Sequence, residues 1–328
     1  MHLPEIGLFN RRQTLGTGLA ALLLGMTPGA VLATSVSAPP SPPAQVRHGR
    51  LERLQGLAWQ QVQPRPVEVW LPPDYGRLQA AGQRFSVIYM HDGQMLWDAS
   101  TTWNRQAWDV DVTLSRLMQT GEIGPTLVVG IWNTVEDRHS EYFPQKHLDD
   151  LDNATRERLL TQALRGRAQA DAYLRFLVQE LKPLIDRRYP TRPGPAHTAL
   201  LGASMGGMIS VYGLCEYPQV FGRAAGLSTH WVGSHQPSAA LAVAAFRYLQ
   251  AHLPAPAGLR LYQDHGTTEL DALYPPHQRI VDQIVRDRGW RESGPEVHYM
   301  SRVFEGTGHN EKAWAERLDV PVRFLLGR

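Results

Sequence analysis

The stretch "LLGASMGGMIS", residues 200–210, decides the fold prediction, because an apolar run ends there at a serine set between small residues. Ser204 lies between Gly202 and Gly206 in a G-x-S-x-G pattern. The apolar run "HTALLGA" comes before it, and apolar residues at helical spacing follow in "MGGMISVYGLCEY". A strand that turns directly into a helix through this pattern is a nucleophile elbow, which needs small residues and exposes the serine hydroxyl. We therefore predict that Ser204 is a nucleophile.

The rest of the chain has the pattern of a single doubly wound α/β domain. Two early strands, in "RLERLQGLAW" and "RPVEVWLPPDY", are expected to form an antiparallel edge. Residues 172–189 carry a helical apolar stripe, and the polar segment 144–170 is long enough to be a surface excursion that overhangs a site. Short, nearly continuous apolar runs indicate strands of a mostly parallel sheet covered by helices on both faces. These runs are residues 85–91, 126–132, 197–204, 223–228, 259–264 and 297–305.

The N-terminus has the layout of a cleavable export signal. Arg11 and Arg12 precede a short apolar stretch, and small residues then lead to Ala33. The arginine pair is typical of the twin-arginine type, so residues 1–33 are predicted to be removed and the protein to be periplasmic or secreted. A bilayer span needs about 20 apolar residues, so no stable membrane insertion is expected after cleavage. A Pro-rich linker, residues 34–46, then leads to a catalytic domain over residues 47–328.

Composition excludes several classes of function. The 33 basic and 31 acidic residues give a net charge of +2 without a Lys/Arg block, so no nucleic-acid partner is expected. The single cysteine, Cys215, excludes an internal disulfide and every multi-cysteine metal site. There is no H-E-x-x-H motif or comparable ligand cluster, which argues against a metallohydrolase. The serine mechanism predicted here requires neither a metal nor an organic cofactor.

A serine nucleophile needs a histidine base and an orienting carboxylate, which follow it in the chain order Ser, acid, His. His309 fits the base best, because it follows the last strand run on a Gly-rich loop and precedes a helix in "FEGTGHNEKAWAERL". The loop "DHGTTELDALYPPHQ" offers Asp264, Glu269 and Asp271 as the acid. Asp264 ends a strand and is also suited to bracing the turn. Sequence spacing alone does not show whether Glu269 or Asp271 is the acid of the triad.

Backbone N–H groups are the expected donors to an oxyanion. The N–H of Met205 lies at the start of the helix that follows the serine. The second candidate is the N–H of Gln94 in "HDGQMLWDAS", where Gly93 is expected to let the backbone approach the substrate. We interpret His91 and Asp92 as braces of this loop.

Substrate-binding residues are expected in the loops at the strand ends, where this kind of fold carries its site. Aromatic walls there suit a sugar, an aryl acyl group or a lipid chain equally well. Arg138, His139 and Glu141 are further candidates for the mouth of the site. The main candidates are Trp97, Trp132, Asn133, Trp231 and Trp314.

Together these stretches resemble the "putative esterase" family of α/β-hydrolases, which is related to esterase D, enterochelin esterase and the feruloyl and acetyl-xylan esterases. The resemblance covers about residues 66–326 and implies the α/β-hydrolase fold, with Ser204 as nucleophile and His309 as base. It favours Asp271 over Glu269 as the acid, because the "LDA" piece is the part similar to the family. The matching stretches are "VIYMHDGQMLWD", "LVVGIWNT" with "RHSEYFP", "YLRFLVQELKPLIDRRYP", "LLGASMGGMIS", "DHGTTELDALYPPHQ" and "GTGHNEKAWAERL".

The implied function is a serine hydrolase that cleaves carboxylic esters through an acyl-enzyme intermediate, with a small-molecule or saccharide ester as substrate. A carbohydrate or siderophore ester is the expected type. Two alternatives remain open from the sequence. One is acyl transfer to a carbohydrate acceptor, and the other is a non-catalytic binding protein that keeps the fold.

Overall fold

An eight-stranded sheet forms the centre of the molecule. The structure is a computed structural model that describes residues 44–233 and 238–327. The strands lie side by side in the order β1-β2-β4-β3-β5-β6-β7-β8. In chain order they are β1 (Arg50–Leu54), β2 (Val67–Leu71), β3 (Ser86–Met90), β4 (Thr126–Ile131), β5 (Thr198–Ala203), β6 (Arg223–Leu227), β7 (Arg260–Gly266) and β8 (Tyr299–Phe304).

The directions of the strands confirm the predicted sheet. β1 pairs antiparallel with β2 and β2 antiparallel with β4, while the pairs from β4 through β3 to β8 are parallel. Five of the six predicted apolar runs contain one parallel strand each, and the sixth, 259–264, ends two residues before β7 does. Strands β2 to β5 are buried along their whole length, as strands covered by helices on both faces must be.

Helices cover both faces of the sheet. Alternate residues of β3 enter different cores: Val87 and Tyr89 pack with α5 to α9, and Ile88 and Met90 pack with α2, α10 and α11. The α-helices are α1 (Tyr75–Ala80), α2 (Val110–Gln119), α3 (Arg138–Tyr142), α4 (Asn153–Gln162), α5 (Ala170–Arg175), α6 (Lys182–Arg188), α7 (Met205–Glu216), α8 (Ala239–His252), α9 (Pro275–Asp287), α10 (Glu311–Arg317) and α11 (Asp319–Leu326). Short 3-10 turns are η1 (Gly93–Met95), η2 (Gln145–Asp150), η4 (Pro195–His197) and η5 (Glu269–Leu273), and η3 (Phe176–Leu181) is π-helical.

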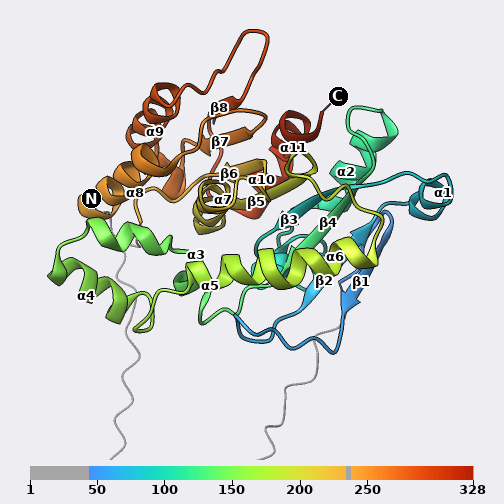
Figure 1. The fold of residues 1–328 in the computed structure, drawn as a ribbon, viewed down its shortest axis with the longest axis horizontal. Coiled ribbons are helices and arrows are strands. Elements are labelled where there is room, and N and C mark those ends of the chain that lie inside the picture. The colour runs from blue at the N-terminus through green and yellow to red at the C-terminus, as the bar shows by residue number, and fades with distance from the viewer. Residues whose placement is uncertain (1–43, 234–237, 328) are drawn as a thin grey trace, which may run out of the picture. The chain divides into compact units, whose positions relative to one another are not determined.

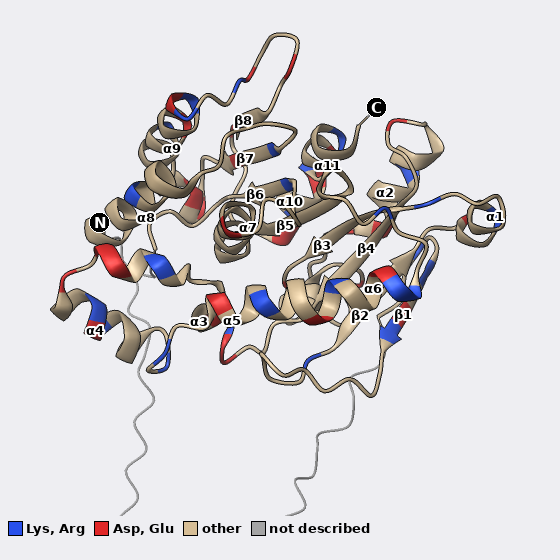
Figure 2. Cartoon of the chain, in the orientation of Figure 1, with Lys and Arg blue, Asp and Glu red and all other residues tan. Residues whose placement is uncertain are grey.

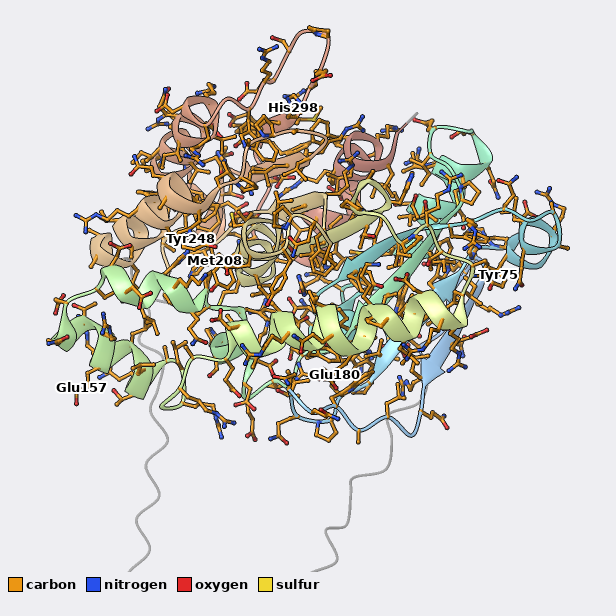
Figure 3. All side chains as sticks on the ribbon, in the orientation of Figure 1. Tyr75, Glu157, Glu180, Met208, Tyr248 and His298 are labelled. Carbon is orange, nitrogen blue, oxygen red and sulfur yellow. The ribbon has the colours of Figure 1, made fainter. Side chains whose placement is uncertain are left out.

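The helix predicted over residues 172–189 is built from α5, η3 and α6, which form one continuous rod in Figure 1. The π turn ends at Leu181, two residues before Pro183. The proline has no N–H, and its ring would collide with the carbonyl of the preceding turn in a regular α-helix. Glu180, labelled in Figure 3, accepts the backbone N–H groups of Gln60 and Gln61 at 2.8 and 3.1 Å. The rod is thereby tied to the segment between β1 and β2.

The polar segment 144–170 is partly helical. It forms η2 and α4, and η2 packs against α8. His147 is buried there with its ring 5.1 Å from the ring of Tyr248, which is labelled in Figure 3. Lys146 binds Glu216 at the end of α7 at 2.6 Å. These contacts attach the segment to the helical layer beside the sheet.

The predicted export signal lies outside the described residues, and so does the linker up to residue 43. The last residues of the expected linker contact the domain: the N–H of Gln45 donates to Asp98 at 3.1 Å, and Val46 packs on the core. Among the described residues, no helix has both the length and the apolar character needed to cross a bilayer. Basic and acidic residues are interspersed along the helices in the view of Figure 2.

Candidate active site

Ser204 lies at the junction of a strand and a helix, as predicted. β5 ends at Ala203 and α7 begins at Met205, and Ser204 between them has φ 57° and ψ −123°. A positive φ is costly for a residue with a side chain, and such strain is typical of functional turns. A Cβ atom on Gly202 would lie 2.7 Å from the backbone of Gly206, so only glycine permits this crossing of strand and helix.

His309 and Asp271 form a short hydrogen-bonded pair. The Nδ1 atom of His309 lies 2.6 Å from Oδ1 of Asp271, and the Asp271 side chain is fully buried. The other oxygen, Oδ2, accepts the Ser228 hydroxyl and the Gly266 N–H, both at 2.6 Å. Burial opposes ionisation of Asp271, but the hydrogen bonds from His309, Ser228 and Gly266 outweigh it and hold the pKa of this carboxyl below its ordinary value. The structure therefore places an ionised carboxylate, with both oxygens hydrogen-bonded, at the Nδ1 edge of the imidazole ring.

The two other carboxylates of the acid loop have different partners. Glu269 accepts the backbone N–H of His309 at 2.8 Å and contacts the side chain of Asn310 at 3.4 Å. Glu269 thus braces the histidine loop, whereas Asp271 meets the imidazole ring. Asp264 lies within β7 and binds Arg317 in a buried ion pair with N–O distances of 3.0 and 3.2 Å.

Tyr274 and His230 lie between Ser204 and His309, and the sequence analysis missed both. The ring of Tyr274 meets the His309 ring edge to face, with centroids 5.8 Å apart. Its hydroxyl lies 2.9 Å from Nδ1 of His230, whose backbone N–H donates to the carbonyl of Ser204 at 3.2 Å. Tyr274 follows Asp271 in the acid loop, and His230 follows β6, next to β5 in the sheet. Both residues follow the carboxyl end of a strand close to β5, and this position in the chain could have identified them as candidates for the site.

A buried network supports the Asp271–His309 pair from behind. The Ser228 hydroxyl, which donates to Asp271, accepts hydrogen bonds from Trp314 Nε1 at 3.0 Å and from Arg317 at 2.9 Å. The Trp314 ring also packs edge to face on His309, with centroids 5.0 Å apart. The sequence predicted no role for Ser228 or Arg317, because their contacts join segments that are distant in the chain.

The two predicted oxyanion donors directly follow two strands that are neighbours in the sheet. The N–H of Met205 is the first of α7 and has no acceptor within the helix. Gln94 lies in η1 after β3, which pairs with β5, and its side-chain Oε1 accepts the N–H of Asn133 at 3.1 Å. Gly93 is also required for packing on β4, because its Cβ would lie 2.7 Å from the backbone of Gly130.

A charged cluster braces the loop that carries Gln94. Asp92 binds Arg138 through both oxygens at 2.8 Å and the Asn133 side chain at 2.6 Å. Burial opposes ionisation of Asp92, but the nearby Arg138 charge and these hydrogen bonds hold its pKa below the ordinary value. His91 is buried with Nδ1 2.8 Å from the Tyr173 hydroxyl, and burial lowers its pKa to about 4. His91 and Asp92 thus occupy bracing positions.

Glu141 does not lie at the mouth of a site, contrary to expectation. Its carboxylate forms two hydrogen bonds with Arg65, at 2.5 and 2.7 Å, and both side chains are buried. His139 and Arg138 share α3 with Glu141, and both are partly exposed. Helix α3 therefore directs Glu141 into the interior, toward Arg65, and directs Arg138 toward Asp92.

Three of the four tryptophans chosen as substrate contacts are buried. Trp97, Trp231 and Trp314 are 3%, 2% and 6% exposed, and Trp231 donates to Gln278 at 3.1 Å. They present almost no surface to a ligand because their rings fill the cores beside the sheet. Trp132 is half-buried and stacks with Arg53, 5.0 Å from its ring centroid.

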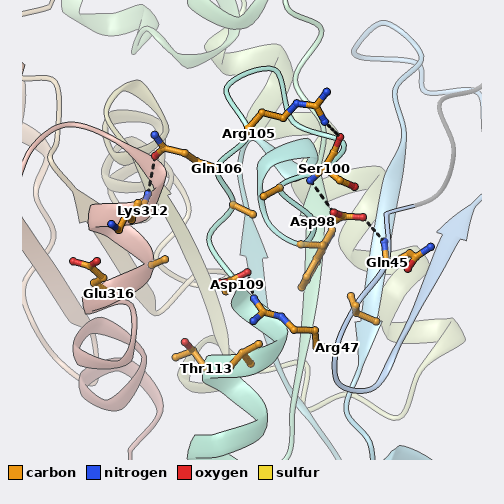
Figure 4. A pocket seen from close by; sticks show the side chains of 16 residues that line it. Gln45, Arg47, Asp98, Ser100, Arg105, Gln106, Asp109, Thr113, Lys312 and Glu316 are labelled. Atoms are coloured by element: carbon orange, nitrogen blue, oxygen red, sulfur yellow. Dashed lines mark hydrogen bonds and ion pairs between the residues drawn. The ribbon is translucent and has the colours of Figure 1, made fainter.

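A cavity of about 880 Å³ lies beside α10 (Figure 4). It is lined by residues 45–47, by the loop 97–107 and by residues of α2 and α10. Ser204, Asp271 and His309 are not among the described residues that line it. Gln106 accepts the N–H of Lys312 across one wall at 3.1 Å, which attaches this loop to the helix after His309. Within residues 44–233 and 238–327, no three His, Cys, Asp or Glu side chains gather as a metal site requires.

Comparison with known proteins gives consistent findings. The family profile described as "Putative esterase" matches residues 62–325. An endo-1,4-beta-xylanase/feruloyl esterase of Xylanibacter ruminicola is 24% identical over 179 residues, which cover 54% of this chain and only 21% of that protein. The enterobactin esterase FES from Shigella flexneri superimposes with a TM-score of 0.59 at 18% identity, over 87% of this chain and 61% of that one. A ferulic acid esterase does so with a TM-score of 0.56 at 17% identity, over 84% and 97%. At these identities the structural matches show a shared fold.

Proposed function

Because the chain belongs to the "putative esterase" family, we propose that it is a carboxylic ester hydrolase that uses Ser204, His309 and Asp271. The observation that carries the proposal is the 2.6 Å contact between His309 Nδ1 and the buried Asp271 carboxylate. Ser204, with its strained backbone, follows β5 of the same parallel sheet. The contact between His309 and Asp271 leaves Nε2 of the imidazole as the atom that can accept a proton. Two contacts support the pairing with Ser204: the backbone N–H of His230 donates to the carbonyl of Ser204, and its ring nitrogen lies 2.9 Å from the hydroxyl of Tyr274, which packs on His309.

The reaction follows from these positions. His309 accepts the Ser204 proton at Nε2 while Ser204 Oγ attacks the ester carbonyl, and Asp271 stabilises the imidazolium that forms. The N–H groups of Met205 and Gln94 stabilise the oxyanion, because both lie at the edge of the sheet where Ser204 is held. The imidazolium then donates its proton to the leaving alcohol. Water repeats the cycle on the acyl-enzyme and releases the acid.

We further propose an ester of an aromatic acid or a saccharide as the substrate. The names of the similar proteins support this class, since they include a feruloyl esterase and an enterobactin esterase. In this chain, Trp132 and Asn133 remain as substrate contacts, because both are partly exposed and follow β4 beside the Asp92 loop. Comparing kcat/KM for methyl ferulate and for acetylated xylo-oligosaccharides tests the class. No hydrolysis of either would contradict it.

Export through the paired arginines, Arg11 and Arg12, is part of the same proposal. N-terminal sequencing of the mature protein from a periplasmic or culture fraction is expected to begin at residue 34. A chain that starts before Arg11 in every fraction would contradict it.

The test of the hydrolase proposal compares two serines near the elbow. Ser204→Ala is expected to abolish hydrolysis of p-nitrophenyl acetate with an unchanged circular dichroism spectrum. Ser210→Ala is the matched control, because Ser210 lies in α7 with its hydroxyl bonded to the carbonyl of Gly206. Equal activities of the two variants would contradict the proposal. Adding a sugar acceptor to the wild-type reaction and analysing the products separates hydrolysis from acyl transfer.

A further inference from the structure

A cavity of about 280 Å³ lies at the edge of the sheet opposite to the one that carries Ser204. Its lining includes Ser86, Arg223 and Arg260, which are the first residues of β3, β6 and β7. Strands β3 and β6 are the neighbours of β5, and Ser204 follows the far end of β5. The six residues of β5 span roughly 20 Å. The cavity is therefore separate from the proposed triad.

Three arginines and a histidine, His197, line this cavity, and none of its described lining residues is acidic. Arg223 and Arg260 are direct partners in the register of β6 and β7, so both side chains leave the same face of the sheet from strands about 4.8 Å apart. Like charges at such paired positions destabilise a sheet. The third arginine, Arg192, is fixed by its backbone N–H, which donates to the carbonyl of Phe85 at 2.8 Å. Positive charge is therefore concentrated at this edge of the sheet.

The hydrogen bonds of the paired arginines leave most of their donors unused. Arg223 donates to two backbone carbonyls, those of Gly222 and Gly258, and Arg260 donates to the carbonyl of Phe324 at 2.8 Å. The Nε atom of Arg223 is buried and has no hydrogen-bond partner among the described residues. A guanidinium carries five N–H donors, so both groups have donors left for a ligand.

A half-buried arginine without a carboxylate partner carries an electrostatic cost. Burial and the nearby Arg260 charge lower the pKa of Arg223 to about 10. Arg223 is still charged at neutral pH, so a bound anion would offset this cost. Buried arginines elsewhere in the described chain already have a carboxylate partner. These pairs are Arg65 with Glu141 and Arg317 with Asp264.

We propose that this cavity binds a phosphate group, held by Arg192, Arg223 and Arg260. A phosphate group that is largely dianionic at neutral pH matches three guanidinium groups better than a singly charged carboxylate, and its oxygens accept paired N–H donors from arginine. The volume is sufficient, because a water molecule in the liquid takes about 30 Å³ and the cavity has about 280 Å³. A free phosphate ion and a phosphate monoester share this chemistry. The site is independent of the proposed hydrolase function.

Isothermal titration calorimetry of the full chain with inorganic phosphate, in chloride buffer at constant ionic strength, tests the proposal. The wild type should bind one phosphate. Arg223→Gln and Arg260→Gln should each weaken binding about ten- to a hundredfold, because hydrogen bonds to a charged group are lost. Titration with glycerol 1-phosphate separates the two sources: tighter binding than that of phosphate assigns the site to a monoester, and equal or weaker binding assigns it to the free ion. No saturable binding of either compound by the wild type would overturn the proposal.

Arg279→Gln is the matched control, because Arg279 is exposed on α9 and the same positive charge is lost. It should leave phosphate binding unchanged. Equal losses of affinity in Arg279→Gln and Arg223→Gln would show attraction to net charge alone and would overturn the proposal.

Thermal unfolding gives a second measurement. Phosphate should raise the Tm of the wild type, and this rise should be largely lost in Arg223→Gln and in Arg260→Gln. A rise that persists in both variants would overturn the proposal. In both variants kcat for p-nitrophenyl acetate should be unchanged, because the cavity lies at the opposite edge of the sheet from Ser204.

Discussion

At the scale of single residues, Asp271 and Glu269, from one short loop, contact different parts of His309. Asp271 contacts the imidazole ring at 2.6 Å, and Glu269 contacts the backbone N–H of the same histidine at 2.8 Å. The first contact selects the tautomer of the ring and stabilises its protonated form. The second contact positions the loop that carries His309 and does not involve the imidazole ring. Substitutions of Asp271 and of Glu269 are therefore expected to lower kcat by different factors.

Asp271→Asn is expected to lower kcat for p-nitrophenyl acetate by about a thousandfold or more, because an amide at this position does not stabilise the imidazolium. Glu269→Gln keeps an acceptor for the backbone N–H and should cost less than about tenfold. Steady-state kinetics of both variants check this. A larger loss in Glu269→Gln than in Asp271→Asn would assign the acid to Glu269.

Asp92 gives a prediction for stability against pH. Its pKa in the folded protein is held below its ordinary value, which in an unfolded chain is about 3.9. The unfolded state therefore binds the proton more readily, so Asp92 contributes stability above about pH 4, and this contribution disappears as the pH falls through the lowered folded value. Asp92→Asn should reduce the free energy of unfolding at pH 7 by on the order of 3 kcal/mol, because Arg138 loses its partner.

Urea unfolding of the wild type and Asp92→Asn at several pH values measures this contribution. The difference between the two proteins should be largest near neutral pH and should shrink as the pH falls below about 4. A difference that stays constant down to pH 3 would show that the pKa of Asp92 is not lowered by folding.

At the scale of elements, the close approach of β5 and α7 determines the geometry of the elbow. The backbone at Gly202 and Gly206 leaves no room for a Cβ atom at the first of these positions. Ser204 is held at its positive φ by this packing and by the hydrogen bond from its N–H to Leu227 in β6, at 2.9 Å. The strain at the serine is therefore maintained by the packing of β5 on α7 and by the hydrogen bond to β6.

Gly202→Ala is expected to lower stability by about 1–3 kcal/mol and to reduce hydrolysis more than tenfold, because the new methyl group displaces the start of α7. Gly76→Ala in α1 is the control. No atom lies within 4 Å of the added Cβ at that position, and alanine is the better helix former. Thermal unfolding and hydrolysis of p-nitrophenyl acetate are the measurements. Wild-type activity in Gly202→Ala would contradict the proposed role of this crossing.

The pair of Arg65 and Glu141 fastens α3 to the segment before β2. Both side chains are buried, so Glu141→Gln leaves a guanidinium without its counter-charge. The free energy of unfolding should fall by about 3–5 kcal/mol in urea titrations. Asp74→Asn, which breaks an exposed pair with Arg77, should have no measurable effect. Equal effects in the two variants would contradict the argument from burial.

The elements differ in how far sequence predicts them. Strands β3 to β6 were predictable because each is a short run of mostly apolar or small residues that is buried along nearly its whole length. The π turn before Pro183 was not, because the same apolar stripe is compatible with a regular helix. The contacts of Ser228, His230 and Tyr274 also escaped prediction. They depend on which strands become neighbours, and that is known only once the sheet order is.

At the scale of the whole molecule, the sheet brings separate segments to one edge. The loops after β3, β5, β6, β7 and β8 carry Gln94, Ser204, His230, Asp271 with Tyr274, and His309. All five strands are parallel, so their carboxyl ends lie at the same edge, where folds of this class carry their sites. The family match over residues 62–325 includes every one of these residues.

The central claim is that Ser204 is the activated nucleophile of this edge. Peptide mapping by mass spectrometry after treatment of the full chain with a fluorophosphonate tests it most directly. We predict one adduct, on the peptide that contains Ser204, and a labelling rate that falls sharply in His309→Ala. Hydrolysis of p-nitrophenyl acetate by a protein that carries no adduct on Ser204, or an adduct on another residue, would contradict the account.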